Sequence, residues 1–365
     1  MGRQETEATK ITPEQVQEYL RRTGHPDAVI ESLAPLGMST QADLKAYGYG
    51  HPLHATYTAA GERGEIVIRT MSPDPFGHNR RSARAETLLL GFDTFNDIPR
   101  HIRALDIGAF DDDGALLPMG RGEFFLVTDF VEGELYAQDL HALQNASDAN
   151  ANDLDRATAL AEYLAELHSV KAEPDAYTRT IRDTVGGGEG IFGLCDSYPS
   201  DCEVAPLDRL RAIEREAVAW RWKLHDKTGR ARRTHGDFHP FNILFRDGTD
   251  FSVLDCSRGG AGEPADDLTC LSINFVFFAL TQRAEFDGAL RALWDRFWTT
   301  YVDVSGDREV LEVVAPFFAW RTLVLASPVW YPNIDDRLRD RLLRFTERLL
   351  GGEPFAPDTI DDLLS

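Results

Sequence analysis

One stretch of the sequence decides the fold: it reads Thr234-His-Gly-Asp-Phe-His-Pro-Phe-Asn-Ile-Leu-Phe245 and is followed by Phe251-Ser-Val-Leu-Asp-Cys256. Apolar residues dominate both runs, and an isolated carboxylate among them is costly to bury unless it has a partner or a metal ion. Asp237 and Asn242 are five residues apart, and Asp255 lies thirteen residues beyond Asn242. The three side chains therefore indicate a functional site.

Phosphoryl transfer from a nucleotide needs such a set of side chains. One carboxylate orients and deprotonates the acceptor hydroxyl, while an Asn and an Asp supply hard oxygen ligands to the Mg²⁺ ion that bridges the phosphates. On this interpretation Asp237 is the catalytic base, and Asn242 and Asp255 are the metal ligands. The predicted cofactor is Mg²⁺, and the predicted phosphoryl donor is ATP or GTP.

The spacing H-x-D-x-x-x-x-N, followed by a strand that ends in Asp, is similar to that of protein kinases. Two further features, Gly236 and the run Gly262-Glu-Pro-Ala-Asp-Asp-Leu268, resemble the aminoglycoside phosphotransferase family, which includes choline-kinase-like and homoserine-kinase-like small-molecule kinases. The resemblance is most specific over residues 234–268 and continues in the same chain order from about residue 44. It implies a two-lobe protein-kinase-like fold and a hydroxyl group on a small molecule, such as an aminoglycoside, amino alcohol or sugar, as acceptor.

Three neighbouring side chains have supporting roles in this interpretation. His235 is predicted to be part of the catalytic loop and to orient it through hydrogen bonds. His239 either faces the substrate or packs within the loop. In the family pattern Asp267 braces the loop, so it is not counted as catalytic.

The rest of the chain predicts an α+β protein with a small antiparallel β lobe and a larger, mostly helical lobe. Strand-like runs at 53–58 and 65–70 flank a turn, a helix is expected over 80–90, and residues 124–131 have the pattern of a buried strand. Residues 139–155 are rich in Asn, Asp and Ala, which suggests a solvated connection. We divide the chain into an N-terminal helical extension (1–35), the nucleotide-binding lobe (36–133) and the helical lobe (134–365).

The nucleotide side of the pattern is less regular. Gly48 and Gly50 precede the first of these strands, where glycines let backbone N–H groups approach the phosphates, although a plain hairpin turn fits them nearly as well. The family usually places a Lys on the third strand to hold the phosphates, and here the candidate is Arg69. Its guanidinium keeps the charge but has a different geometry. Glu86 either pairs with Arg69 or is a solvated surface residue.

Two other segments bear on ligand binding. Asp129 and Val131 resemble the segment between the lobes, which contacts the purine through backbone atoms. The run Gly188-Glu-Gly-Ile-Phe-Gly193 fits G-x-G-x-x-G, but no apolar strand precedes it, so residues 186–193 are predicted to be a mobile loop, with a direct role near the acceptor left open. Arg321 and Trp330-Tyr331 lie where such kinases build the acceptor pocket, although core packing is the favoured role for them.

Composition narrows the class of partner. The 365 residues include 60 acidic and 38 basic ones, a net charge of −22, which argues against binding to nucleic acid or to an anionic membrane. Four scattered cysteines and no secretory signal predict a cytoplasmic protein. The alternative to an enzyme is a catalytically silent nucleotide-binding module, which Arg69 in place of Lys motivates. A protein kinase is disfavoured because Cys256 follows Asp255, where that pattern has Phe-Gly.

Overall fold

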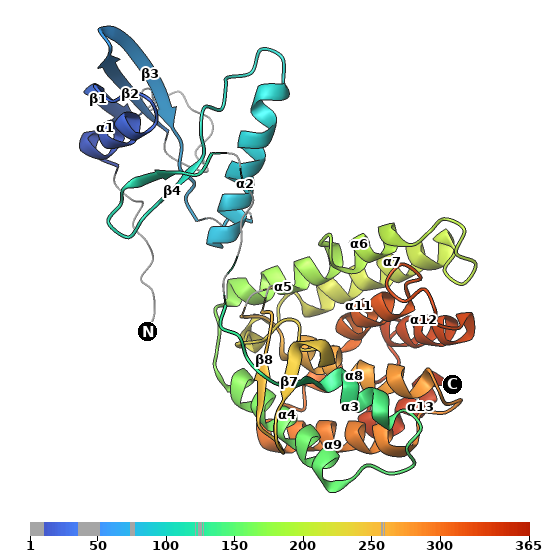
Figure 1. Cartoon of the computed structure of the whole chain (residues 1–365). Coiled ribbons are helices and arrows are strands. Elements are labelled where there is room, and N and C mark those ends of the chain that lie inside the picture. The colour runs from blue at the N-terminus through green and yellow to red at the C-terminus, as the bar shows by residue number, and fades with distance from the viewer. Residues whose placement is uncertain are drawn as a thin grey trace. The chain divides into compact units, whose positions relative to one another are not determined.

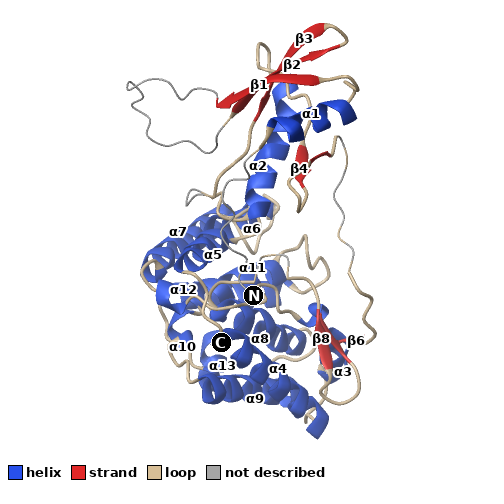
Figure 2. Ribbon diagram, turned by 90° about the vertical axis from the view of Figure 1, so that its left-hand side faces the viewer, coloured by secondary structure: helices blue, strands red, loops and turns tan. Residues whose placement is uncertain are grey.

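The computed structural model describes residues 11–35, 52–73, 77–120, 122, 126, 128–256, 258 and 260–365. The chain divides into two compact units, Met1–Thr128 and Asp129–Ser365, called here the N-terminal and C-terminal units. Figure 1 labels their helices and strands, and Figure 2 shows that helices predominate in the C-terminal unit. The predicted α+β class, a small antiparallel sheet and a larger helical part, is confirmed.

The N-terminal unit begins with α1 (Pro13–Arg22), whose start is encoded by a capping box. Thr12 accepts a hydrogen bond from Gln15 N at 3.3 Å, and the side chain of Gln15 accepts one from Thr12 N at 2.8 Å. These two bonds satisfy backbone donors that a helix start otherwise leaves free. Val16 and Leu20 form the buried face of the helix.

A three-stranded antiparallel sheet packs against α1. Its order is β1 (Val29–Pro35), β2 (Leu53–Ala59) and β3 (Glu62–Ile68), so the two predicted strands are present and β3 begins a few residues early. Ala55 and Tyr57 of β2 join the small core with α1. Residues 13–35, which we had separated as an extension, thus share a core with the strands that follow.

The remaining elements of this unit are a helix and a hairpin. α2 (Arg81–Thr94) matches the helix predicted over 80–90, and η1 (Phe95–Asp97) continues it. β4 (Gly108–Phe110) and β5 (Leu116–Pro118) pair in antiparallel fashion.

The buried strand expected over residues 124–131 is wrong for the residues of this segment that the structure describes. Leu126 and Phe130 are 87% and 89% exposed, and neither lies in a strand. An apolar run becomes a buried strand only where a neighbouring strand supplies hydrogen bonds and cover, and the described residues supply none here. The division between the two units falls in this segment, at Thr128.

The C-terminal unit is built from helices around one short sheet. Its helices are α3 (Tyr136–Leu143), α4 (Ala151–Ser169), α5 (Pro174–Gly186), α6 (Ile191–Ser197), α7 (Leu207–Leu224), α8 (Pro264–Leu280), α9 (Gly288–Ser305), α10 (Val310–Val313), α11 (Ala315–Ala326), α12 (Asp336–Leu350) and α13 (Ile360–Leu364), with the single turns η2 (Thr228–Arg230), η3 (Pro240–Asn242) and η4 (Pro357–Thr359). The sheet has the order β6 (Glu134–Leu135), β7 (Ile243–Phe245), β8 (Phe251–Val253).

The solvated connection predicted over 139–155 is wrong at both ends, since α3 and α4 occupy most of it. The polar residues that suggested a loop are in part a helix cap. Asn150 accepts a hydrogen bond from Asp153 N at 3.1 Å, and Asp153 accepts one from Asn150 N at 2.9 Å. Composition alone does not separate a capped helix start from a loop.

Helix α8 is the centre of the C-terminal unit, because every one of its residues is buried. Figure 1 shows it between α9 on one side and α11 with α12 on the other. Aromatic rings fill the space around these helices, including Trp294, Trp298, Phe318 and Phe355. Polar residues at the N-terminal end of α8 are thereby held in a rigid, dehydrated setting.

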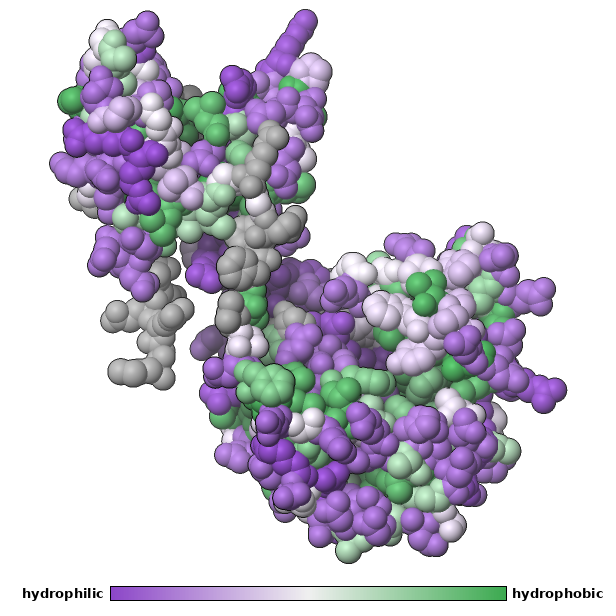
Figure 3. Space-filling model, viewed as in Figure 1, coloured by the Kyte–Doolittle hydropathy of each residue, from purple (hydrophilic) through white to green (hydrophobic). Residues whose placement is uncertain are grey.

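The surface agrees with the composition. Hydrophilic residues cover most of the face in Figure 3, with smaller apolar areas among them. None of the four cysteines forms a disulfide bond, and two of them are buried. Within the described ranges no helix is long and apolar enough to cross a membrane.

Candidate active site

The predicted catalytic loop ends in a turn that fixes the start of β7. Pro240 opens the single turn η3, and Asn242 closes it just before the strand. Leu254 N then donates to Asn242 O at 2.8 Å, which extends the pairing of β7 with β8 by one step. Asp255 follows at once, so the hairpin brings Asn242 and Asp255 to the same end.

Asp255 leaves β8 with an unusual backbone conformation. Its φ angle is +51°, in the left-handed region that non-glycine residues seldom adopt. Such strain concentrates at functional sites, where surrounding structure holds it in place. It turns the chain sharply away from the hairpin beside Asn242.

Asn242 and Asp255 fit a Mg²⁺ ion that is completed by phosphates. Asn242 Nδ2 donates to Asp237 O at 3.1 Å, which directs the amide oxygen to the other side. No group of three or more His, Cys, Asp or Glu side chains is placed to hold a metal within the part of the chain that the structure describes. A pair of oxygen ligands is nevertheless what Mg²⁺ takes from a protein when a nucleotide supplies the others.

Asp237 is buried and is held by two arginines through one oxygen. Arg321 Nη1 lies 2.9 Å and Arg258 Nη1 lies 2.8 Å from Asp237 Oδ1. Burial works against ionisation of this carboxyl, but a hydrogen bond from His239 and the charges of the two arginines outweigh it and hold its pKa well below the usual range. Asp237 is therefore a carboxylate at neutral pH.

The backbone of the catalytic loop is fixed by a carboxylate on α8. Asp267 accepts hydrogen bonds from His235 N and Gly236 N, both at 2.7 Å. His235 Nδ1 accepts a weaker bond from Asp237 N at 3.3 Å. Asp267 thus contacts the loop as the family pattern implies. Among the described residues, the hydrogen bonds of His235 are with the backbone of the loop and with Asp267, and not with the carboxylate of Asp237.

His239 stands next to the carboxylate of Asp237. Its Nε2 lies 3.5 Å from Asp237 Oδ2, and its Nδ1 accepts a hydrogen bond from Phe241 N at 3.1 Å. The ring therefore contacts the backbone of the turn through one nitrogen and faces the carboxylate with the other.

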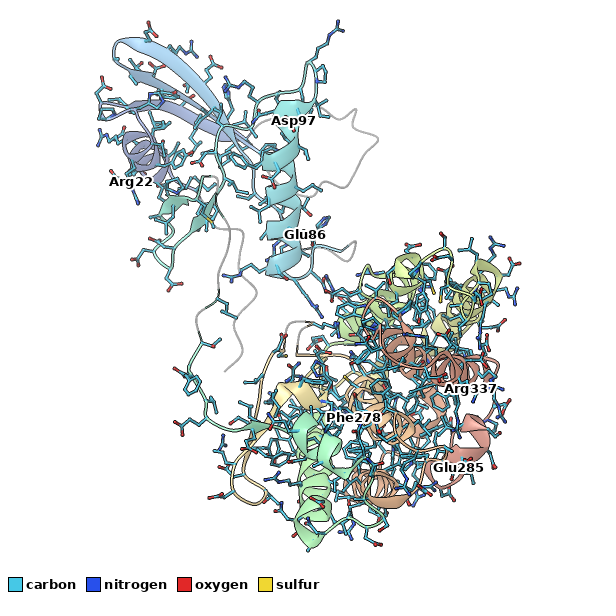
Figure 4. The ribbon with its side chains drawn as sticks, turned by 45° about the vertical axis from the view of Figure 1, so that its right-hand side comes forward. Arg22, Glu86, Asp97, Phe278, Glu285 and Arg337 are labelled. Carbon is cyan, nitrogen blue, oxygen red and sulfur yellow. The ribbon has the colours of Figure 1, made fainter. Side chains whose placement is uncertain are left out.

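The nucleotide-side residues lie in the N-terminal unit or at the start of the C-terminal one. Arg69 comes directly after β3 and Glu86 lies on α2, where Figure 4 labels it. Both are exposed, and among the described residues no ion pair joins them. Gly48 and Gly50 lie outside the described residues.

Asp129 and Val131 open the C-terminal unit and precede β6, which pairs with β7 through Glu134 and Phe245. Gly133 lets the chain before β6 come close to β7, because a Cβ at this position would lie only 3.0 Å from Phe245 O. The segment after Val131 therefore runs directly beside the strand that follows Asn242.

Comparison with known proteins assigns the family. A model described as "Phosphotransferase enzyme family" matches residues 55–302, which is most of the chain and includes Asp237, Asn242 and Asp255. The chain belongs to this phosphotransferase family. The predicted family resemblance and enzyme class, a phosphotransferase that acts on small molecules, are confirmed. No curated protein matches the sequence.

Several solved phosphotransferase structures are similar over nearly the whole chain, at low identity. Aminoglycoside phosphotransferase APH(2'')-Ib with bound ADP is 15% identical, with 93% of this chain and 99% of that one covered and a TM-score of 0.36. Macrolide 2'-phosphotransferase MphH from Brachybacterium faecium is 15% identical, with 90% and 98% covered and a TM-score of 0.31. Plasmodium vivax ethanolamine kinase is 13% identical, with 96% and 85% covered and a TM-score of 0.34.

Sequence reasoning missed the two arginines that hold Asp237 in this phosphotransferase. The sequence-based predictions do not single out Arg258, and they favour core packing for Arg321. The sequence did carry a signal, because Arg321 is the single charge within the apolar helix α11. A lone buried charge needs a partner of opposite sign, and α8 offers two buried carboxylates, Asp266 and Asp267.

The segment 186–193, predicted as a loop, also touches this arrangement, although α5 takes up its first residue and α6 its last three. It is a tight corner between α5 and α6, in which a Cβ on Gly193 would lie only 1.8 Å from Gly188 O. Glu189 Oε2 lies 3.3 Å from Arg258 Nε, and Trp320 Nε1 donates to Glu189 O at 2.6 Å. The corner therefore reaches Asp237 through Arg258.

Proposed function

We propose that this phosphotransferase transfers the γ-phosphoryl group of ATP or GTP to a hydroxyl group of a small molecule, with Mg²⁺ as cofactor. One observation carries the proposal. Asp237 and Asn242 share one buried loop, at the end of the hairpin from which Asp255 emerges, in a member of a phosphotransferase family.

Each side chain has a distinct part in the proposed reaction. The acceptor oxygen forms a bond to the γ-phosphorus while the bond from that phosphorus to the bridging oxygen breaks, and ADP or GDP leaves. The Asp237 carboxylate orients the hydroxyl and accepts the proton that it loses. Asn242 and Asp255 would hold Mg²⁺, which neutralises charge on the phosphates.

The other residues support binding and position. Arg69 would neutralise phosphate charge, with Glu86 as its partner when nucleotide is bound and Gly48 and Gly50 as the turn over the phosphates. Asp129 and Val131 would meet the purine through backbone atoms. His235 keeps the catalytic loop in shape. The acceptor is an aminoglycoside-like compound, an amino alcohol, a sugar or a related metabolite, and the reaction takes place in the reducing cytoplasm, where free thiols persist.

The test is a screen of such acceptors with Mg²⁺–ATP and Mg²⁺–GTP, monitored by release of ADP or GDP. Asp237→Asn should abolish nucleotide-dependent phosphorylation of the acceptor that the screen identifies. The matched control is Asp250→Asn, which removes an exposed carboxylate from the turn between β7 and β8, where Asp250 pairs with Arg246. Unchanged phosphorylation by Asp237→Asn would show that the assignment is wrong.

A catalytically silent nucleotide-binding module is the second candidate. Two features favour it: an Arg in place of the usual Lys at position 69, and two arginines bonded to Asp237 Oδ1. It predicts a Mg²⁺-dependent rise in melting temperature with ATP but no turnover of any acceptor.

A further inference from the structure

Arg321 is a buried cation that contacts Asp237 directly. It lies on α11 and is 7% exposed. Its guanidinium makes three charge-assisted or polar contacts: Nη1 with Asp237 Oδ1 at 2.9 Å, Nη2 with Gly236 O at 3.1 Å, and Nη2 with Asp266 Oδ1 at 2.5 Å. It therefore joins three separate elements: α11, the start of α8 and the catalytic loop.

The two oxygens of Asp237 have different surroundings as a result. Oδ1 accepts from both Arg321 and Arg258, and its lone pairs are engaged. Among the residues that the structure describes, the contacts of Oδ2 are long, to His239 Nε2 and to Asn242 Nδ2, each at 3.5 Å. Of the two oxygens, Oδ2 is therefore the better placed to accept a hydrogen bond from a hydroxyl group.

The two arginines differ in how firmly they hold the carboxylate. Arg258 has a side chain 29% exposed and is shared with Glu189. Arg321 is fixed at its far end by Asp266, whose side chain is only 6% exposed. A planar guanidinium with two anchored ends loses little further freedom and sets the orientation of what it binds.

We propose that Arg321 is a positioning residue for phosphoryl transfer: it holds Asp237 by Oδ1 and the loop by Gly236 O, so that Oδ2 faces the acceptor hydroxyl. The inference rests on the proposed function. In this proposal Arg321 acts through Asp237 and Gly236, which its guanidinium contacts, so its effect falls on the rate of the chemical step and not on binding. A displacement of the reacting group by about 1 Å is enough to slow such a step by about 100-fold.

The test uses the full-length protein with Mg²⁺–ATP and the acceptor panel, and also with water as acceptor, followed by ADP release. Arg321→Gln should lower kcat by about 100-fold and leave KM for ATP within about threefold, because only positioning is lost. Arg321→Lys should regain about tenfold in kcat, since a single ammonium can replace one of the three contacts. A kcat at the wild-type level in Arg321→Gln would overturn the inference.

A second variant separates positioning from folding. Arg321→Gln leaves Asp266 buried without its cation, so the double variant Arg321→Gln with Asp266→Asn should regain stability but not kcat. Recovery of kcat together with stability would show a structural role only and overturn the proposal. The control is Arg339→Gln, on α12, which removes another buried arginine, one that bonds Ala326 O and Tyr331 O and pairs with the exposed Asp336. It should lose stability and keep kcat.

The outcome also distinguishes this inference from the function on which it rests. Wild-type turnover in Asp237→Asn, or no turnover by the unaltered protein with water or any acceptor, overturns both. An inactive Asp237→Asn with fully active Arg321 variants overturns the positioning role alone.

Discussion

His168 Nε2 lies 3.1 Å from Asp267 Oδ2, and Nδ1 of the same ring lies 2.9 Å from the hydroxyl of Tyr301. The other contacts of Asp267 Oδ2 and Oδ1 are the backbone N–H groups of His235 and Gly236. One carboxylate therefore joins α4, α8 and α9 to the catalytic loop. The position of the loop depends on a polar network in the interior of the C-terminal unit.

Asp267→Asn should loosen this loop. An amide offers one acceptor oxygen where the carboxylate offers two, and its NH₂ group meets a backbone donor. Hydrogen bonds to a charged group contribute about 1.5–3 kcal/mol, so we expect a loss of that order in the free energy of unfolding. We expect kcat to fall by about 10–100-fold through misplacement of Asp237. Denaturant unfolding and turnover measure the two effects, with Asp208→Asn, an exposed site on α7, as control. A loss of stability with unchanged kcat would show that Asp267 does not position the catalytic loop.

Much of this site could be predicted from the sequence, because most of its residues are close to one another along the chain. Asp237, Asn242 and Asp255 lie within one loop and one hairpin, so their spacing along the chain already fixes their neighbourhood. Arg321 could not be placed in the same way. It comes from a helix 84 residues beyond Asp237, and only tertiary packing brings the two together. The prediction of a buried strand at 124–131 was wrong for a related reason. Whether an apolar run is buried depends on neighbouring strands, and the sequence pattern does not show where those strands lie.

The salt bridge between Arg230 and Glu263 should support folding more than any surface pair. Arg230 Nη2 and Nε bond the two carboxylate oxygens of Glu263 at 2.6 and 2.8 Å, and Glu263 is fully buried at the start of α8. Arg230→Met leaves that charge without its cation, with the Ala265 N–H as a remaining donor, which costs about 3–5 kcal/mol. The double variant Arg230→Met with Glu263→Gln should recover more than half of the loss in urea unfolding. The exposed pair of Arg211 and Asp208 provides the control, since Arg211→Met should change stability by less than about 0.5 kcal/mol.

The same variant should have a defined pH dependence. Burial raises the pKa of Glu263 even with Arg230 present, and loss of the arginine removes an opposing effect. A carboxyl whose pKa is higher in the folded state than in the unfolded state binds more protons when folded, so stability falls as pH rises through that pKa. The deficit of Arg230→Met should therefore be smaller at pH 5 than at pH 8. An equal deficit at both values would indicate that Glu263 stays ionised and reaches water in the variant.

Nucleotide affinity should depend on the charge at position 69 under the proposed function. Arg69→Ala removes a cation from the phosphates, and we expect Kd for Mg²⁺–ATP to rise about tenfold or more, equivalent to about 1.4 kcal/mol. Arg69→Lys keeps the charge and should stay within about threefold of the original Kd. Arg63→Ala removes another exposed arginine of the same region, on β3, and serves as control in calorimetric titrations. Equal Kd values for all three variants would remove Arg69 from the nucleotide site.

Thiol reactivity tests the proposed metal-binding role of Asp255, because the four cysteines differ in accessibility and Cys256 is its neighbour. Cys256 is exposed and follows Asp255 directly, whereas Cys195 and Cys270 are buried. Burial raises the pKa of Cys195 to about 12, and it raises the pKa of Cys270 well above the usual range, so neither forms the reactive thiolate at pH 8. A disulfide reagent should therefore modify Cys256 first, Cys202 more slowly, and the other two only in denaturant. Mg²⁺–ATP should slow the first phase if Asp255 holds the metal ion, and Cys256→Ser should abolish that phase. A first phase whose rate is the same with and without Mg²⁺–ATP, under conditions where calorimetry shows the nucleotide bound, would place the ligand away from Asp255.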